Sequence, residues 1–230
     1  MSDDGRGKAE GYIRPQGKGA RGRIFENDFL EWMTRVAPGV ALACYLPVVA
    51  ALIYWNFRQG YVPNVIFAAL LFVAGVLFWT LFEYLAHRFV FHLAGESEAV
   101  TKFAYRIHGV HHEFPRDHGR LFMPPPIGYA VSAALFGLLY LVMGGSTFMF
   151  FAGFLMGYLG YAFLHYCMHR FRPPPMLKFL WRHHLQHHYK CPDLAFGVSS
   201  PLWDMVFRTL PPSEPAQSRL EEDPMRAVRT

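Results

Sequence analysis

Cysteine and charge are both scarce in this chain of 230 residues. It has only three cysteines, Cys44, Cys167 and Cys191, and no recognisable spacing pairs them. That scarcity argues against a disulfide framework and is typical of a reducing compartment. Charged residues make up 17% of the sequence against 53% hydrophobic residues. An ordinary soluble domain carries more charge and less apolar surface, so the composition predicts an integral membrane protein.

Long uncharged runs give that prediction its topology. No charged residue occurs from Val36 to Phe57, from Gln59 to Phe82, or from Leu121 to Leu164. Because one helical crossing needs roughly 20 residues, the last run is long enough for two. We expect an all-α protein with four transmembrane helices in two hairpins, at about 36–57, 60–82, 127–143 and 147–166. Glycine-containing breaks at 58–60 and 144–146 would be the turns. The first run begins far from Met1 and lacks a small-residue cleavage site, so no signal peptide is expected.

Basic residues are unevenly distributed around these runs. Of the 22 Lys and Arg residues, only Arg58 would lie on the side of the hairpin turns. The positive-inside rule therefore predicts that both termini and the segments between the hairpins are cytosolic. This bias also accounts for the net charge of +5, and a nucleic-acid partner is not expected.

The order along the chain predicts one domain between two tails. Residues 1–30 are expected to form a mobile polar tail, residues 31–210 the folded domain, and residues 211–230 a loose carboxyl-terminal tail. Within the domain, segments 83–120 and 165–208 would form a cytosolic cap. Gly17, Gly19 and Gly22 match the spacing of a dinucleotide loop. No strand pattern precedes them and no helix pattern follows, so a nucleotide site is not predicted.

Ten of the 12 histidines fall into four boxes that predict metal binding. Side chains three or four residues apart share one face of a helix, and neutral imidazole is a common ligand of iron, zinc and copper. Neighbouring residues on one turn could reach different metals. The first box is the exception, because five residues turn about 140° on an ideal helix. Both of its histidines can be ligands only if they reach separate metals, or if the helix distorts or ends between them. The boxes are His87 and His92; His108, His111 and His112; His165 and His169; His184, His187 and His188.

Ten imidazoles are too many for one ion, and two ions with about five ligands each fit the count. A structural zinc site would need four ligands and favour cysteine, and a haem would need two axial histidines, so a redox-active iron pair with positions left for oxygen suits the set better. His118 and His183 fall outside the pattern and are expected to be solvated or to support a ligand. Glu83 and Asp204 are candidates for carboxylates that hold a ligand's second ring nitrogen, although a helix cap or an ion pair is the simpler role for Asp204.

The boxes, in the order H-x-x-x-x-H, H-x-x-H-H, H-x-x-x-H and H-x-x-H-H, resemble the fatty acid hydroxylase and sterol desaturase superfamily. Two stretches are similar to fatty acid 2-hydroxylases in particular: IHGVHHEFPRDHGRLFMPPP at 107–126 and FGVSSPLWDMVFRT at 196–209. The resemblance covers about 81–210. It implies a four-span helical protein whose cytosolic cap holds two metal ions on the ten histidines. Eukaryotic members often carry an amino-terminal cytochrome haem domain, and we expect none in this chain.

The activity that the resemblance implies is O2-dependent hydroxylation at C2 of a long fatty acyl chain, either a free acid or a sphingolipid amide. Iron is the expected metal, and zinc could replace it in purified protein. Two electrons must come from a separate ferredoxin or cytochrome, since the chain has no flavin or nicotinamide motif. Aromatic residues near a membrane edge commonly anchor a protein at the interface. Six of them are nevertheless the candidates for the substrate pocket: Tyr84, Tyr105, Phe114, Phe122, Tyr161 and Tyr189.

Two other functions compete with this one. A sterol or carotenoid hydroxylase or desaturase of the same superfamily would share the metal centre. A membrane metal carrier or sensor would need ligands along the spans, whereas the histidine boxes lie at their predicted cytosolic ends and the span interiors hold no ionisable side chain.

Overall fold

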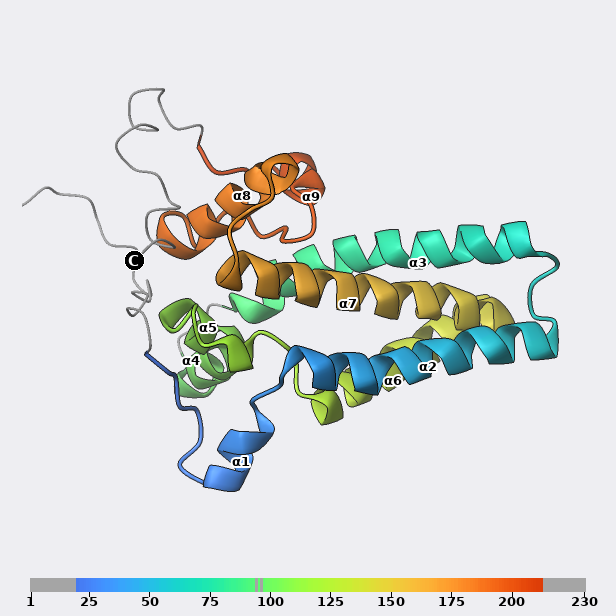
Figure 1. Cartoon of the computed structure of the whole chain (residues 1–230), viewed down its shortest axis with the longest axis horizontal. Coiled ribbons are helices and arrows are strands. Elements are labelled where there is room, and N and C mark those ends of the chain that lie inside the picture. Colours follow the sequence, from blue (N-terminus) through green and yellow to red (C-terminus); the bar gives the residue numbers. More distant parts are fainter. Residues whose placement is uncertain (1–19, 94, 96, 213–230) are drawn as a thin grey trace, which may run out of the picture.

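The computed structural model describes residues 20–93, 95 and 97–212, and the regular elements in these residues are all helical. Four long helices run lengthwise through the molecule (Figure 1): α2 (Pro38–Gln59), α3 (Val65–Ala86), α6 (Pro125–Met143) and α7 (Thr147–Arg170). Of the tails predicted at 1–30 and 211–230, residues 1–19, with Gly17 and Gly19, and residues 213–230 lie outside the described residues.

Local sequence sets the ends of these helices. Pro38 lies in the first turn of α2, where a missing N–H costs nothing, and Gly60 ends the helix in a left-handed conformation with φ 64°. The Asn64 side chain then accepts a hydrogen bond from the Phe67 N–H and caps α3. Helix α3 therefore begins at Val65 and not at residue 60, as the uncharged run predicts. The connection 60–64 lies between the two helices, with the cap of α2 at Gly60 and the cap of α3 at Asn64.

The short connections between α2 and α3 and between α6 and α7 lie at the same end of the bundle. Gly145, between α6 and α7, lies against the ring of Tyr61, between α2 and α3. Tyr61 also packs on Phe148, with ring centroids 5.2 Å apart. All four histidine boxes lie toward the other end, where α3 and α7 finish.

Helix α7 is the centre of the bundle and contacts α2, α3 and α6. It approaches α3 through two glycines: a Cβ on Gly153 would meet the carbonyl of Phe72, and one on Gly75 would meet the carbonyl of Phe150. Small residues at a helix crossing let the two backbones come together. This close packing brings the histidine-bearing ends of α3 and α7 into register.

Three helical stretches are long and apolar enough to cross a membrane: Pro38–Gln59, Val65–Phe91 and His118–Arg170. The third contains α6 and α7, joined by a short 3-10 turn at Gly144–Ser146. The composition-based prediction of an integral membrane protein agrees with these stretches.

Short helices form a cap at the histidine end (Figure 1). They are α4 (Glu98–Ala104), α5 (Val110–Glu113), α8 (Lys178–Tyr189) and α9 (Leu202–Val206). Two π-helical turns, His87–Phe91 and Tyr105–Gly109, continue α3 and α4 into this cap.

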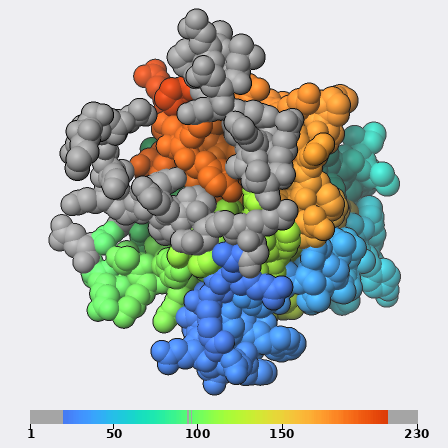
Figure 2. Space-filling view, turned by 60° about the vertical axis from the view of Figure 1, so that its left-hand side comes forward, coloured from blue at the N-terminus to red at the C-terminus, as the bar shows by residue number. Residues whose placement is uncertain are grey.

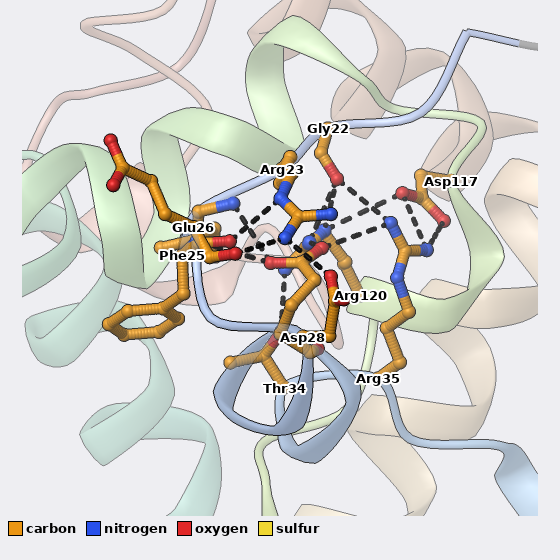
Figure 3. A network of polar contacts seen from close by, with 11 residues as sticks. Gly22, Arg23, Phe25, Glu26, Asp28, Thr34, Arg35, Asp117 and Arg120 are labelled. Atoms are coloured by element: carbon orange, nitrogen blue, oxygen red, sulfur yellow. Dashed lines mark hydrogen bonds and ion pairs between the residues drawn. The ribbon is translucent and has the colours of Figure 1, made fainter.

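Residues 20–30 are part of the fold, which corrects the prediction of a mobile tail as far as residue 30. The segment leads into α1 (Asp28–Met33) and forms a lobe beside the cap (Figure 2). Arg120, whose side chain is 2% exposed, donates to the Gly22 carbonyl and pairs with Glu31 (Figure 3). Arg35 pairs with Asp117 at 2.9 Å. The buried Arg120 cation needs partners, and Gly22 and Glu31 supply them.

Candidate metal centre

The ten boxed histidines converge into two groups of five. In each group one ring nitrogen from every member lies within 4.8 Å of the others. The first histidine group contains His87, His92, His108, His112 and His187. The second histidine group contains His111, His165, His169, His184 and His188. Except for half-buried His92, all ten are buried.

Each H-x-x-H-H box divides between the two groups. His108 and His112, four residues apart, point into the first group, whereas His111 points into the second. The fourth box does the reverse, because His184 and His188 join the second group and His187 joins the first. The predicted sharing of one helical turn between two sites is therefore present. The rings of His112 and His188 stack with centroids 4.3 Å apart, so the two groups lie side by side.

A π-helical turn explains how both members of the first box reach one group. The His92 N–H donates to the His87 carbonyl at 3.2 Å, an i→i+5 bond. This wider turn brings residues five apart onto one face, which an ideal α-helix does not do. The alternative in which His87 and His92 serve separate sites is thereby excluded by the geometry.

The nitrogens are spaced as metal ligands should be. The Nε2 atoms of His87 and His112 both lie 3.0 Å from Nε2 of His108, and Nε2 of His169 lies 2.9 Å from Nε2 of His184. Two nitrogens about 2.1 Å from one ion and at right angles to each other would be about 3.0 Å apart. The spacing suits an ion of higher coordination number with five imidazoles.

His111 provides a second test of whether a metal fits. It is 3% exposed, and neither of its ring nitrogens has a hydrogen-bond partner among the described residues. A buried polar atom without a partner is costly, and a metal ion in the second histidine group would satisfy one nitrogen. The second histidine group thus has both the donors and the unmet demand of a metal site.

Backbone carbonyls fix the tautomers of two members of the first group. Nδ1 of His87 lies 2.5 Å from the Phe196 carbonyl, and Nδ1 of His187 lies 2.7 Å from the Leu194 carbonyl. A carbonyl only accepts, so each Nδ1 carries the proton and each Nε2 presents its lone pair to the group.

The boxed histidines of the cap are held neutral. Burial, followed by repulsion from neighbouring imidazoles, lowers the pKa far below its ordinary value for His108, His111, His112, His184, His187 and His188. Burial lowers the pKa of His92 to about 4, against the opposing effect of Asp193. Metals bind neutral imidazole, so this environment favours ligation at neutral pH.

Asp204 supports the first group without touching it. Its carboxylate accepts from the N–H groups of Phe196 (2.9 Å) and Gly197 (2.8 Å), from the Thr209 hydroxyl (2.7 Å) and from Nε2 of His183 (2.9 Å). The Phe196 carbonyl belongs to the same peptide group as the Gly197 N–H, and it accepts from Nδ1 of His87. The candidate role of binding a ligand ring directly is wrong for Asp204, because its bonds go to a loop and to His183, which belongs to neither group.

Glu83 also acts on the loop after residue 195. It accepts from the N–H groups of Val198 (2.6 Å) and Ser199 (2.9 Å) and from the Ser199 hydroxyl. No hydrogen bond to a ligand histidine involves Glu83 in the part of the chain that the structure describes, which corrects the expectation from its spacing to His87. Sequence reasoning missed Phe196 and Leu194, because backbone carbonyls leave no residue-type signal.

The six aromatic pocket candidates lie in different surroundings. Tyr161 is parallel to His165, with centroids 5.7 Å apart, and Tyr189 lies beside His188 at 6.3 Å. Tyr84 is fully buried, bonded to the Thr209 hydroxyl and stacked on Phe207.

The other three lie away from the ligand rings. Phe122 belongs to the bundle core, and Phe114 lies against Gly22. Tyr105 donates to Glu113 at 2.7 Å. Of the six, Tyr161 and Tyr189 therefore have a ring beside a histidine of the second group.

Comparisons with known proteins agree with this site. The fatty acid hydroxylase family model matches residues 72–209, which include all four histidine boxes. The dihydroceramide fatty acyl 2-hydroxylase FAH2 of Arabidopsis thaliana is 38% identical over 192 residues, covering 82% of this chain and 80% of its own length. The fatty acid 2-hydroxylase of Rattus norvegicus is 33% identical, covering 84% of this chain and 57% of the relative.

A yeast relative connects sequence and structure. The ceramide very long chain fatty acid hydroxylase SCS7 of Saccharomyces cerevisiae is 38% identical, covering 85% of this chain and 51% of the relative. A solved structure described as full-length Scs7p, with only the hydroxylase domain visible, superimposes with a TM-score of 0.76 at 38% identity. The match covers 82% of this chain and 71% of that one. With its ten boxed histidines gathered in one place and these matches, the chain belongs to the fatty acid hydroxylase family.

Proposed function

We propose that this chain is a membrane-bound hydroxylase that inserts oxygen at C2 of a long fatty acyl chain, either as a free acid or as a sphingolipid amide. The observation that carries the proposal is the pair of adjacent five-histidine groups at one end of an apolar helix bundle. Relatives with the same boxes are named fatty acyl or ceramide hydroxylases, and several of those names specify the 2-position.

Each histidine group would hold one metal ion, with iron as the active metal. When bound, an iron pair supplies the redox chemistry that activates O2. One oxygen atom enters the C2–H bond and the other leaves as water, a balance that requires two electrons and two protons. A separate ferredoxin or cytochrome is the proposed electron donor, docking by charge on the basic end of the molecule.

The chain's own residues position the reaction and keep it dry. The carbonyls of Phe196 and Leu194 hold His87 and His187 in one tautomer, and Asp204 fixes the loop that supplies the first of these carbonyls. Burial of both groups excludes bulk water from a reactive centre. Tyr161, parallel to His165, is the aromatic residue that we assign to the substrate pocket beside the second group.

We further propose that α2, α3, α6 and α7 make four crossings in two hairpins. The shared position of Tyr61 and Gly145 supports two turns on the same side. Arg58 is the basic residue near those turns, whereas Arg88, Arg120 and Arg170 are near the histidine end, so the positive-inside rule favours a cytosolic metal centre.

Expression in a host that makes no 2-hydroxy acyl chains tests this function. We expect 2-hydroxy fatty acids in the host lipids, labelled when the culture receives 18O2, and no product from a His108→Ala variant. Mass spectrometry of the free fatty acids and of the intact sphingolipids, supplied separately as substrates to the purified protein, would separate the free-acid and amide substrates.

Two results would overturn the proposal. Unchanged acyl chains together with altered sterols or carotenoids would assign the chain to another reaction of the superfamily. Purified protein that binds two metal ions but never consumes O2 with reductant and acyl substrate would favour the carrier alternative.

A further inference from the structure

An open-sided groove of about 450 Å³ lies on the outside of the molecule, between α7 and the segment that leads into α8. One wall is a single face of α7, made by Gly160, Phe163, Leu164 and Cys167 at helical spacing. Trp181 of α8 closes the other side. The lining is almost entirely apolar, and Arg172 is the charged residue among those that line it.

The groove is separate from the metal centre. On an ideal helix, the face made by residues 160, 163, 164 and 167 points roughly 150° or more away from His165 and His169. Those two histidines are buried on the bundle side of α7, whereas Phe163 is 52% exposed. Substrate lying in the groove would therefore be on the wrong side of α7 to reach either histidine group.

Charge at the groove is of one sign. Arg172 has no ion pair among the described residues, and the sequence has no acidic residue between Asp117 and Asp193. Arg170, Lys178 and Arg182 flank the same stretch of chain. An unpaired arginine beside an apolar channel fits a ligand with an anionic head and a hydrocarbon chain.

The location selects a membrane lipid as that ligand. Phe163 belongs to the stretch His118–Arg170, which is apolar enough to cross a membrane, and Arg172 follows directly where the stretch ends. A bilayer places hydrocarbon along the first and phosphate at the level of the second. A protein partner would have to displace these lipids.

We propose that this groove is a binding site for one anionic phospholipid. One acyl chain lies along the face of α7 from Gly160 to Cys167, and the head-group phosphate pairs with Arg172. The site goes beyond the proposed hydroxylase function and does not require it.

The glycine at the floor of the groove allows a direct test. A Cβ on Gly160 meets nothing within 4 Å, so the side chain of Gly160→Leu can start from this position without a clash and extend into the groove. Gly137 of α6 is equally open and provides the matched control Gly137→Leu. For charge, Arg172→Gln is compared with Arg58→Gln at the opposite end of the bundle.

Delipidated full-length protein is titrated with dioleoyl phosphatidylglycerol or dioleoyl phosphatidylcholine and examined by native mass spectrometry. We expect tighter binding of phosphatidylglycerol, about fivefold weaker binding of it in Arg172→Gln, and loss of the selective site in Gly160→Leu. Both control variants should bind as the wild type does, and all four should retain wild-type metal content.

Three outcomes would overturn the site. Equal binding of the two lipids would remove the role of Arg172, and unchanged binding in Gly160→Leu would place the lipid elsewhere. Displacement of phosphatidylglycerol by a free long-chain fatty acid, with a raised KM for that acid in Gly160→Leu, would make the groove a substrate site. The first two results do not depend on whether the hydroxylase proposal succeeds, because lipid binding and metal content are measured without turnover.

Discussion

The N–H of His92 donates to the carbonyl of His87 across an i→i+5 turn, and this bond places both rings in the first histidine group. An α-helical turn at the same place would point one ring away from the other. The π-helical turn is therefore part of the candidate metal centre, because it brings both histidines of the first box into one group.

Single histidine substitutions should empty one group at a time. We expect His87→Ala and His111→Ala each to lose about one of two ions per chain, because each removes one of five ligands from a different group. Metal analysis of anaerobically purified protein measures the stoichiometry. His118→Ala is the control and should keep both ions. Equal loss of both ions in every variant would contradict two separable sites.

Asp204→Asn should weaken metal binding although Asp204 touches no ligand ring. The amide accepts fewer hydrogen bonds, so the Phe196–Gly197 loop and the carbonyl that orients His87 lose their anchor. Changes to groups that orient ligands typically cost 10–100-fold in affinity. Competition with a chelator measures this loss, and Glu98→Gln, an exposed carboxylate paired with Lys102, is the control. Unchanged affinity would show that Asp204 is merely structural.

Metal-free protein should lose stability as the pH falls from about 6.5 toward 4. The folded pKa of His92 is about 4 and those of six other cap histidines are well below 6.5, so the unfolded chain takes up protons first and is favoured by acid. Thermal unfolding of the chelator-treated protein between about pH 7.5 and about 5 checks the slope. His92→Asn should reduce it, and a flat profile in the wild type would refute the cause.

Removing the Arg120 charge should destabilise the cap. Arg120→Gln leaves the carboxylates of Glu31 and Asp117 buried with fewer partners, a change that costs about 3–5 kcal/mol in comparable buried pairs. Arg23→Gln breaks an exposed pair with Asp28 and should have little effect. Thermal unfolding in one detergent compares them, and similar midpoints would mean that the amino-terminal network contributes nothing.

A single methyl group at the α3–α7 crossing should also be destabilising. Gly153→Ala places a Cβ against the Phe72 carbonyl, and overpacking of this kind costs about 1–3 kcal/mol or more. Gly137→Ala, on an open face, should instead stabilise its helix slightly. Thermal unfolding midpoints of the two variants are compared with that of the wild type. Equal shifts in both variants would exclude a close crossing at Gly153.

The candidate metal ligands could be read from the sequence because imidazole spacing is a local property. Intervals of three and four residues put the rings of the last three boxes on one helix face, and ten imidazoles are too many for one ion. The uncharged runs likewise predict apolar helices because length and composition decide what can cross a bilayer.

Assignments that depend on distant segments could not be read in this way. Glu83 and Asp204 are candidates from the sequence for carboxylates that hold a ligand ring, with an ion pair as the simpler role for Asp204, but each is bonded to the loop that follows Ala195. Residues 20–30 have the composition of a polar tail, whereas in the fold the Gly22 carbonyl accepts from buried Arg120.

By itself, the sequence determined the type and number of the candidate ligands and the length of the apolar helices, since these are properties of local composition and spacing. The tertiary structure alone decided which histidine serves which group, because His111 and His112 are neighbours in the chain but point to different groups. It also decided that His87 and His92 act together. The physical reason is that convergence on a common point depends on how α3, α7 and α8 pack, which no local spacing specifies.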